Sequence, residues 1–365
     1  MKNHRICLVV GTRPEIIKMA PVIYECERRC LDYLLVHSGQ HYSFFMNRIF
    51  FEELGIRQPC VNLNTGSGSQ AEEIARILLG MEKVLEKEKP AVVLCQGDTN
   101  TVLAAAIAAS RAEIVLGHVE AGLRSRDKNM PEEINRIIAD RLSDLLFAPT
   151  REAGANLLQE GIDEGKVFIT GNTIVDAVLA NIDEGKAQQL LKRYGLKEGM
   201  YFVMTLHRQE NVDNPSTMLS IIEGLRSVAD EFGLPILFPA HPRTIKNLEK
   251  MGLSSTFLTI IEPIGYRDFL QLLSKSRLVM TDSGGVQEEA CILRVPCVTI
   301  RTSTERPETV EVGANIVAGV SKDGILEGVE KMLSVKRNWP NPFGDGMAGK
   351  RIVKITEERL GNPRA

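Results

Sequence analysis

Short apolar runs alternate with longer amphipathic stretches along the whole chain. In the first half, strands are predicted at residues 6–10, 33–37, 91–95, 113–119, 145–148 and 166–170, and helices at 15–29, 71–87, 101–110, 131–142 and 152–160. In the second half, strands are predicted at 201–205, 236–239, 258–261, 278–281 and 297–300, and helices at 216–232, 266–274, 286–293 and 322–333. This alternation is typical of parallel α/β sheets. We therefore expect an α/β protein with two Rossmann-like, doubly wound domains.

The pattern also suggests where the domains divide. We expect an N-terminal domain at residues 1–172 and a C-terminal domain at 173–345, joined by a helical segment and a charged stretch that ends near residue 198. The tail, 346–365, has helical spacing and is expected to cross back to the first domain. Ligands of doubly wound domains bind beyond the carboxyl ends of the strands. We therefore expect the two domains to face a cleft.

Composition narrows the class of partner. The 365 residues carry a net charge of −3 without a long basic run, so nucleic acid and anionic membranes are poor partners. The apolar run at 6–10 is too short for a membrane span or a signal peptide, which predicts a cytoplasmic protein. The seven cysteines form no CxxC pair and no zinc pattern, so we expect reduced thiols and no metal.

The stretch GTRPEIIK, residues 11–18, follows the first strand and opens a helix. It is not a G-x-G-x-x-G fingerprint, and the second strand ends without an acidic residue for a ribose, so a nicotinamide cofactor is not expected. Arg13 and Lys18 are two cations near a helix start, which suits a diphosphate. For Lys18 the alternative of a solvated helix face carries equal weight.

Carboxylates follow two later strands of the first half. Asp98, in QGDTNT, can cap a helix, but Thr99 and Asn100 can do so too and leave Asp98 for chemistry. Glu120, in GHVEAGLRS, stands at a strand end, where a carboxylate is costly unless paired or used. Glu132 and Glu133, in MPEEINR, lie in the first turn of a helix, where favourable interaction with the helix dipole is the simpler interpretation. Together, Asp98, Glu120 and one of the Glu132–Glu133 pair on one rim would be candidates for acid–base chemistry.

Three stretches of the second half carry further candidates. His207, in LHRQEN, follows a strand and could transfer a proton, bind a phosphate or serve only the fold. In MTDSGGVQEEA, Ser283 to Gly285 stand at the mouth of a helix, where small residues let an anion approach bare N–H groups. Arg306, in STERPET, adds a cation for the same phosphates.

This set of motifs resembles a known family. The stretches GTRPE, GQH, QGDT, HVEAGLR, PEEINR, HRQEN, TDSGGVQEEA and TERPE occur in the order seen in non-hydrolysing UDP-N-acetylglucosamine 2-epimerases, from Gly11 to about Arg306. The resemblance implies a GT-B-like fold and reversible conversion of UDP-N-acetylglucosamine to UDP-N-acetylmannosamine without metal or other cofactor. It also implies a cytoplasmic homodimer that supplies polysaccharide or glycoconjugate synthesis.

Matched motif by motif, the resemblance implies individual roles. The catalytic residues would be Asp98, Glu120 and Glu132, together with His207. UDP would be bound at its phosphates by Arg13, Lys18, His207, Ser283, Gly284, Gly285 and Arg306, at its ribose by Glu289, and at its uracil by Tyr266, a position that is often Phe in the family. A second, regulatory UDP-N-acetylglucosamine would contact Gln40, His41, Arg208, His241 and Arg243.

The implied reaction breaks the C1–O bond to UDP, gives a 2-acetamidoglucal, and adds UDP back after a proton has reached the other face of C2. Three alternatives remain: a GT-B glycosyltransferase, a hydrolysing UDP-sugar 2-epimerase, and a sensor of nucleotide sugars with no use for the carboxylates. The sequence leaves open the substituents at C3 and C4 of the sugar and which carboxylate serves which face of C2.

Overall fold

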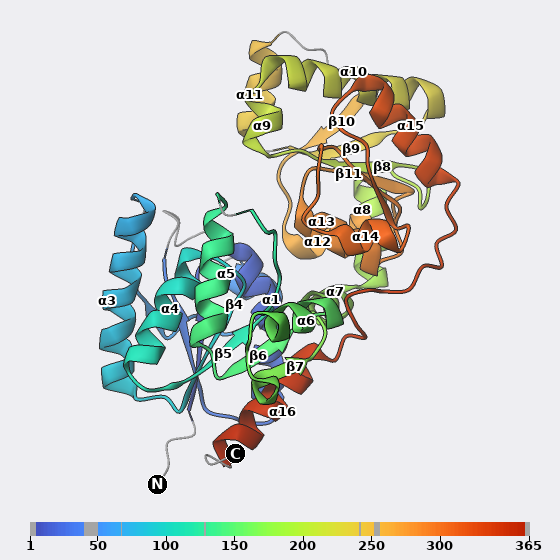
Figure 1. The fold of residues 1–365 in the computed structure, drawn as a ribbon. Helices are drawn as coiled ribbons and strands as arrows, with labels where there is room; N and C mark the ends of the chain where they lie inside the picture. The colour runs from blue at the N-terminus through green and yellow to red at the C-terminus, as the bar shows by residue number, and fades with distance from the viewer. Residues whose placement is uncertain are drawn as a thin grey trace. The chain divides into compact units, whose positions relative to one another are not determined.

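The computed structural model describes residues 5–39, 50–66, 68–127, 129–240, 242–251 and 256–361. The chain forms two compact units, one of residues 1–179 together with 343–365 and one of residues 180–342 (Figure 1). Each unit is a parallel sheet covered by helices, so the expected class of two doubly wound α/β domains is confirmed.

The first unit is built on a seven-stranded sheet in the order β3-β2-β1-β4-β5-β6-β7. Its helices α3, α4 and α5 pack side by side, and α16 packs against α1 (Figure 1). The strands are β1 (Ile6–Val10), β2 (Tyr33–His37), β3 (Val61–Asn62), β4 (Val92–Gln96), β5 (Val115–Val119), β6 (Leu145–Ala148) and β7 (Val167–Ile169). The helices are α1 (Arg13–Arg28), α3 (Gln70–Glu88), α4 (Asn100–Arg111), α5 (Pro131–Leu142), α6 (Arg151–Gln159), α7 (Thr173–Asn181), which runs to the boundary, and α16 (Ala348–Gly361).

The second unit has a six-stranded sheet in the order β10-β9-β8-β11-β12-β13. The strands are β8 (Phe202–Thr205), β9 (Ile236–Pro239), β10 (Leu258–Ile261), β11 (Leu278–Thr281), β12 (Cys297–Thr299) and β13 (Asn315–Val317). The helices are α8 (Glu184–Tyr194), α9 (Gln209–Val212), α10 (Pro215–Phe232), α11 (Pro242–Lys250), α12 (Tyr266–Ser274), α13 (Gly284–Ile292), α14 (Pro307–Glu311) and α15 (Lys322–Leu333).

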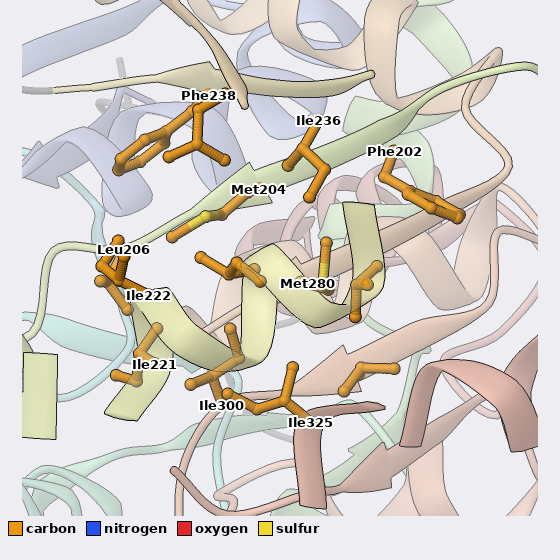
Figure 2. Close-up of a cluster of buried hydrophobic side chains, with 14 of the residues drawn as sticks. Phe202, Met204, Leu206, Ile221, Ile222, Ile236, Phe238, Met280, Ile300 and Ile325 are labelled. Atoms are coloured by element: carbon orange, nitrogen blue, oxygen red, sulfur yellow. The ribbon is translucent and has the colours of Figure 1, made fainter. Parts of the chain in front are cut away.

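The core of the second unit shows why its strands read as continuous apolar runs. Figure 2 shows side chains of β8, β9 and β11 gathered around α10, among them Phe202, Phe238 and Met280. Helices cover both faces of a parallel sheet, so the side chains on both faces of its central strands are buried and apolar. Such strands therefore show no alternation of apolar and polar residues. The chain departs from expectation at the edge strands β3 and β13, which have two and three residues and are too short to leave a periodic pattern.

Hydrogen bonds and an ion pair hold both ends of the C-terminal helix α16 against the rest of the first unit. Asp176, on α7, accepts the N–H groups of Ala348 and Gly349 at 3.2 and 2.9 Å, which satisfies donors that a helix start leaves unpaired. Near the other end, Arg29 donates to Glu357 at 2.5 Å. A Cβ added at Gly349 would lie only 2.8 Å from the carbonyl oxygen of Pro21 on α1, so the helices meet backbone to backbone there.

We expect Gly349→Ala to lower the free energy of unfolding of the first unit by about 1–3 kcal/mol, the usual cost of overpacking. Without a close contact, replacing glycine by alanine inside a helix stabilises it by about 1 kcal/mol. A loss of stability in Gly349→Ala would therefore identify the close contact. Gly361→Ala is the matched control, because a Cβ there meets no described atom within 4 Å. Urea unfolding followed by circular dichroism measures both; equal stability of the two variants would contradict the close packing.

Candidate active site

The candidate residues of each unit lie at the carboxyl ends of neighbouring central strands. In the first unit, β1, β4 and β5 are adjacent, and they lead into Arg13, Asp98 and Glu120 respectively. In the second unit, β8 and β11 are adjacent and lead into His207 and Ser283. The order of strands reverses at β1/β4 and at β8/β11, and such reversals are where doubly wound sheets bind ligands.

Glu120 is a buried carboxylate held by three other parts of the first unit. Lys18 Nζ on α1 lies 2.6 Å from Glu120 Oε1, and both side chains are less than 10% exposed. The amide of Gln96, at the end of β4, donates to Glu120 Oε2, and Asn172 donates to Oε1 at 3.2 Å. Glu120 has φ of +71°, a conformation that non-glycine residues seldom adopt. Lys18, expected to face a diphosphate, is thus paired with a carboxylate.

Asp98 is fixed by two residues of helix α5. The guanidinium of Arg136 donates to the Asp98 carboxylate, and Asn135 Nδ2 donates to the Asp98 carbonyl at 2.9 Å. Thr99 is the N-cap of α4 and accepts from Val102 N–H. The side chain of Asp98 is 31% exposed, so it is oriented by an ion pair and still reaches the surface.

The two glutamates at the start of α5 differ in their use. Glu133 is buried and accepts the N–H groups of Ser125 and Arg126, each at 2.9 Å, and a bond from Arg136 at 2.9 Å. Burial opposes ionisation of Glu133, but these donors outweigh it, so the pKa is lowered. Glu132 is half-buried, and its side chain makes no hydrogen bond or ion pair with any described residue. Glu133 therefore shapes the preceding loop, and Glu132 remains the candidate for chemistry.

The turn after β1 is organised by Glu15, which sequence reasoning passed over. Arg13, the first residue of α1, is exposed, and its guanidinium carbon lies 4.4 Å from the centroid of the Phe50 ring. Glu15 accepts the N–H groups of Gly11 and Thr12 at 3.0 and 2.5 Å and the hydroxyl of Thr99 at 2.8 Å. It therefore ties the turn that carries Arg13 to the turn that carries Asp98. Burial raises the pKa of Glu15 to about 7, against the lowering effect of these bonds.

In the second unit His207 is oriented by Asp282. Asp282 is fully buried and accepts the backbone N–H groups of His207 and Arg208 at 3.0 and 2.8 Å and the amide of Asn211 at 3.2 Å. His207 Nδ1 lies 2.9 Å from Asp282 Oδ1, and the His207 side chain is 58% exposed. Burial opposes ionisation of Asp282, but His207 and the N–H donors outweigh it and lower its pKa. With Nδ1 bound, Nε2 is the ring nitrogen left for a ligand.

The start of α13 has the features of an anion site. Ser283 is the N-cap, and its side chain makes no capping hydrogen bond. A Cβ added at Gly284 or Gly285 would meet protein atoms no closer than 3.7 and 3.9 Å respectively. Packing within this chain therefore does not require glycine at either position. An anion held by the N–H groups would require it, because such a ligand needs a close approach to the backbone.

The two adjacent glutamates of α13 also have different surroundings. Glu288 is buried, and its Oε1 lies 2.7 Å from Nε of Arg306. Glu289, the next residue, is buried one turn inside the helix. Arg306 is thereby held beside α13 by a carboxylate of that helix.

The structure describes only some of the remaining candidate residues. Tyr266, the first residue of α12, is 2% exposed and so offers at most an edge to a ligand. Arg208 lies 3.5 Å from Glu305, which two hydrogen bonds from Arg301 hold at 2.7 and 2.9 Å. Of the other residues predicted for a second UDP-sugar, Gln40, His41, His241 and the side chain of Arg243 lie outside the described part of the chain.

We also searched the described residues for metal-binding groups and for membrane-spanning helices. Within the described ranges no three His, Cys, Asp or Glu side chains are grouped so that they could hold a metal ion. No helix in the same ranges is long and apolar enough to cross a bilayer. All seven cysteines are free thiols.

The raised pKa of Glu15 predicts a distinct dependence of stability on pH. The unfolded carboxyl ionises near pH 4.5 and the folded one near 7, so the folded state holds the proton longer and loses stability as pH rises between these values. At about 1.4 kcal/mol per pKa unit, this loss is about 3 kcal/mol. The side chain of Glu15→Gln cannot ionise, so the free energy of unfolding of this variant should rise relative to that of the wild type between pH 4.5 and 8. Glu82→Gln, exposed on α3, is the control; parallel pH curves for wild type and Glu15→Gln would refute the expectation.

Comparison with known proteins identifies the family to which the chain is similar. The family described as UDP-N-acetylglucosamine 2-epimerase matches residues 24–357. A UDP-N-acetylglucosamine 2-epimerase of Methanocaldococcus jannaschii is 51% identical over 359 residues, 96% of this chain and 98% of the relative. A crystal structure of the M. jannaschii enzyme in complex with UDP-GlcNAc and UDP has a TM-score of 0.86 at 51% identity and covers 97% of this chain and 99% of its own.

A more distant relative acts on a different sugar. The UDP-2,3-diacetamido-2,3-dideoxy-D-glucuronate 2-epimerase of Pseudomonas aeruginosa is 40% identical over 355 residues, 96% of this chain and 98% of the relative. The expected resemblance and the GT-B-like class of fold are confirmed. The chain belongs to the UDP-N-acetylglucosamine 2-epimerase family.

Proposed function

We propose that this protein interconverts UDP-N-acetylglucosamine and UDP-N-acetylmannosamine at C2 of the sugar without net hydrolysis. The observation that carries the proposal is the group of three carboxylates in the first unit. Asp98 and Glu120 follow the paired strands β4 and β5, and Glu132 lies in the first turn of the helix whose Arg136 binds Asp98. The close relationship to enzymes of this name supports the choice of substrate.

The chemistry requires more than one acid–base group. The C2 proton of the sugar is weakly acidic, because no carbonyl group adjoins C2 in the ring. In the proposed reaction the C1–O bond breaks first, and its electron pair leaves with the UDP oxygen. A carboxylate then takes the C2 proton, and the C2–H electron pair forms the C1–C2 double bond of a 2-acetamidoglucal. In the return step a proton reaches the opposite face of C2, and the UDP oxygen attacks C1. Two faces of one carbon require two proton-transfer groups.

We assign the proton transfers to Asp98, Glu120 and Glu132. Glu120 has Lys18 against one oxygen, which places a positive charge beside a carboxylate that would otherwise be costly to bury. Asp98 is oriented by Arg136, whereas Glu132 has no described partner and can meet the sugar directly.

We assign the departing UDP to the second unit and to Arg13. The N–H groups at Ser283 to Gly285 and the cation of Arg306 suit the diphosphate, and Glu289 suits the ribose hydroxyls. His207, with Nδ1 turned to Asp282, would present its other ring nitrogen to the phosphates of UDP. Tyr266 would contact the uracil with an edge of its ring. Stabilising negative charge on UDP lowers the barrier to breaking the C1–O bond.

Three finer features remain proposals. The second UDP-N-acetylglucosamine would act as an activator by binding one state of the enzyme better than another. Of its predicted contacts, the described structure contains only the side chain of Arg208. A homodimer is proposed from the family resemblance. A cytoplasmic location is supported by seven free thiols, which suit a reducing compartment.

The proposed function is tested by incubating the protein with UDP-N-acetylglucosamine in D₂O, with excess EDTA and no acceptor, and following C2 by NMR. We expect deuterium at C2 and the appearance of UDP-N-acetylmannosamine without net release of UDP. Release of UDP with free sugar would support the hydrolysing alternative, and a requirement for an acceptor would support a glycosyltransferase. Binding without exchange would support a sensor. The UDP-2,3-diacetamido sugar acid of the P. aeruginosa relative, in a second arm, tests the substituents at C3 and C5, and 3-deoxy and 4-deoxy analogues test C3 and C4.

The same assay tests the assigned roles. Asp98→Asn, Glu120→Gln and Glu132→Gln should each lower turnover by roughly 10²-fold or more, the scale of general acid–base catalysis. Affinity for UDP, measured by calorimetry, should survive better in Glu132→Gln than in Arg13→Ala. Near-normal turnover in all three carboxylate variants would refute the mechanism.

A further inference from the structure

A chain of buried charged side chains lies within the first unit beside the proposed catalytic carboxylates. His118 on β5, Asp140 on α5 and Arg124 in the loop after β5 have side chains that are 0%, 1% and 5% exposed. Arg124 also pairs with Glu160 at 2.7 Å, next to the end of α6. Buried charges are costly unless they are paired, so an arrangement of this kind calls for an explanation.

The contacts of His118 fix its protonation. Nε2 lies 2.7 Å from the carbonyl oxygen of Gly97, which can only accept a hydrogen bond, so Nε2 carries a proton. Nδ1 lies 2.7 Å from Asp140 Oδ1. The other oxygen of Asp140 receives Arg124 at 2.7 Å and the N–H of Gly122 at 3.2 Å, the surroundings of an ionised carboxylate. Nδ1 therefore donates as well, and His118 is an imidazolium.

The electrostatic surroundings agree with this assignment. Burial disfavours the imidazolium, but the carboxylate of Asp140 and the carbonyl of Gly97 outweigh burial, so the pKa of His118 is raised above 6.5. Burial likewise opposes ionisation of Asp140, but His118 and Arg124 lower its pKa overall. Glu120, on the strand end beyond His118, adds attraction for the same positive charge. The Cys95 thiol on the neighbouring strand has its pKa raised by burial and stays neutral.

His118 and Asp140 contact the two turns that carry the proposed catalytic carboxylates, Asp98 and Glu120. Gly97, with φ of +87°, comes directly before Asp98. Gly122, with φ of +81°, follows Glu120 by two residues, and its N–H donates to Asp140. The ion pair of His118 and Asp140 is therefore hydrogen-bonded to the backbone of both turns: to the residue before Asp98 and to the second residue after Glu120.

We propose that His118 is a positioning residue of the epimerase reaction, which holds the Gly97–Asp98 turn through its Nε2–H and, through Asp140, holds the turn after Glu120. This inference rests on the proposed function. His118 is buried and touches no substrate in this account. It acts by fixing where Asp98 stands, and misplacing a reacting group by about 1 Å can cost roughly 10²-fold in rate.

Two neutral substitutions separate the two bonds of His118. In His118→Gln the amide nitrogen can take the place of Nε2 and keep the bond to Gly97. In His118→Asn it can take the place of Nδ1, so that the bond to Asp140 remains and the bond to Gly97 is lost. Both variants lose the positive charge, but Asn is one methylene shorter than Gln and leaves the larger gap. The difference in kcat is therefore compared with UDP affinity, which a general loss of packing would also lower.

The assay of C2 exchange in D₂O measures kcat and KM for the wild type and both variants, and calorimetry measures UDP affinity. We expect kcat to fall roughly 10-fold or more further in His118→Asn than in His118→Gln, with UDP affinity within about twofold of the wild type in both. Equal kcat in the two variants, or a fall in UDP affinity that parallels kcat, would overturn the proposal. Absence of exchange in the wild type would instead overturn the proposed function.

A second measurement tests the proposal even if the variants fail to fold. Histidine labelled with ¹⁵N in the wild-type protein, which has six histidines, should show one ring that keeps both N–H protons to a higher pH than an ordinary histidine, whose pKa is 6.5. Neutral spectra for every histidine at pH 6.5 would overturn the proposal, because a neutral His118 could not donate both bonds.

Discussion

Burial of the Glu120 carboxylate is the constraint around which the first unit is arranged. A carboxylate with so little access to water must be given a cation and hydrogen-bond donors, or it would be too costly to keep. Its partners come from three separate elements: Lys18 from α1, Gln96 from β4, and Asn172 from the segment before α7. The backbone at Glu120 adopts a left-handed conformation to present it, a strain that is typical of functional sites. The arrangement of α1, β4 and β5 is thereby tied to one side chain.

The second unit solves a similar problem with a different set of donors. Asp282 is as buried as any residue of the core, yet its donors are two backbone N–H groups, an amide and the ring of His207. A carboxylate surrounded in this way is kept ionised by these donors and can fix one ring nitrogen of His207. Asp282 follows β11, where the order of strands reverses, whereas Glu120 follows β5, one strand beyond the reversal at β1/β4.

Much of the fold could be predicted because alternation between strands and helices leaves a clear trace in the sequence. Strands β3 and β13 could not be, since two or three residues carry no period. Candidate site residues were found because polar groups after apolar strands are unusual, as at Asp98 and His207. The pairing of these residues could not be predicted, because Lys18 and Glu120 are 102 positions apart and Asp282 and His207 are 75 apart, and no local pattern links them.

The proposed reaction requires the C1–O bond to break and UDP to stay bound until it adds back. UDP-N-acetylglucosamine with ¹⁸O in the bridge between C1 and the β-phosphorus tests it directly, with ³¹P NMR to locate the label. Free rotation of the β-phosphate of bound UDP makes its oxygens equivalent, so the account predicts movement of the label into non-bridging positions of unreacted substrate during epimerisation. Epimerisation with the label wholly retained in the bridge would contradict the account.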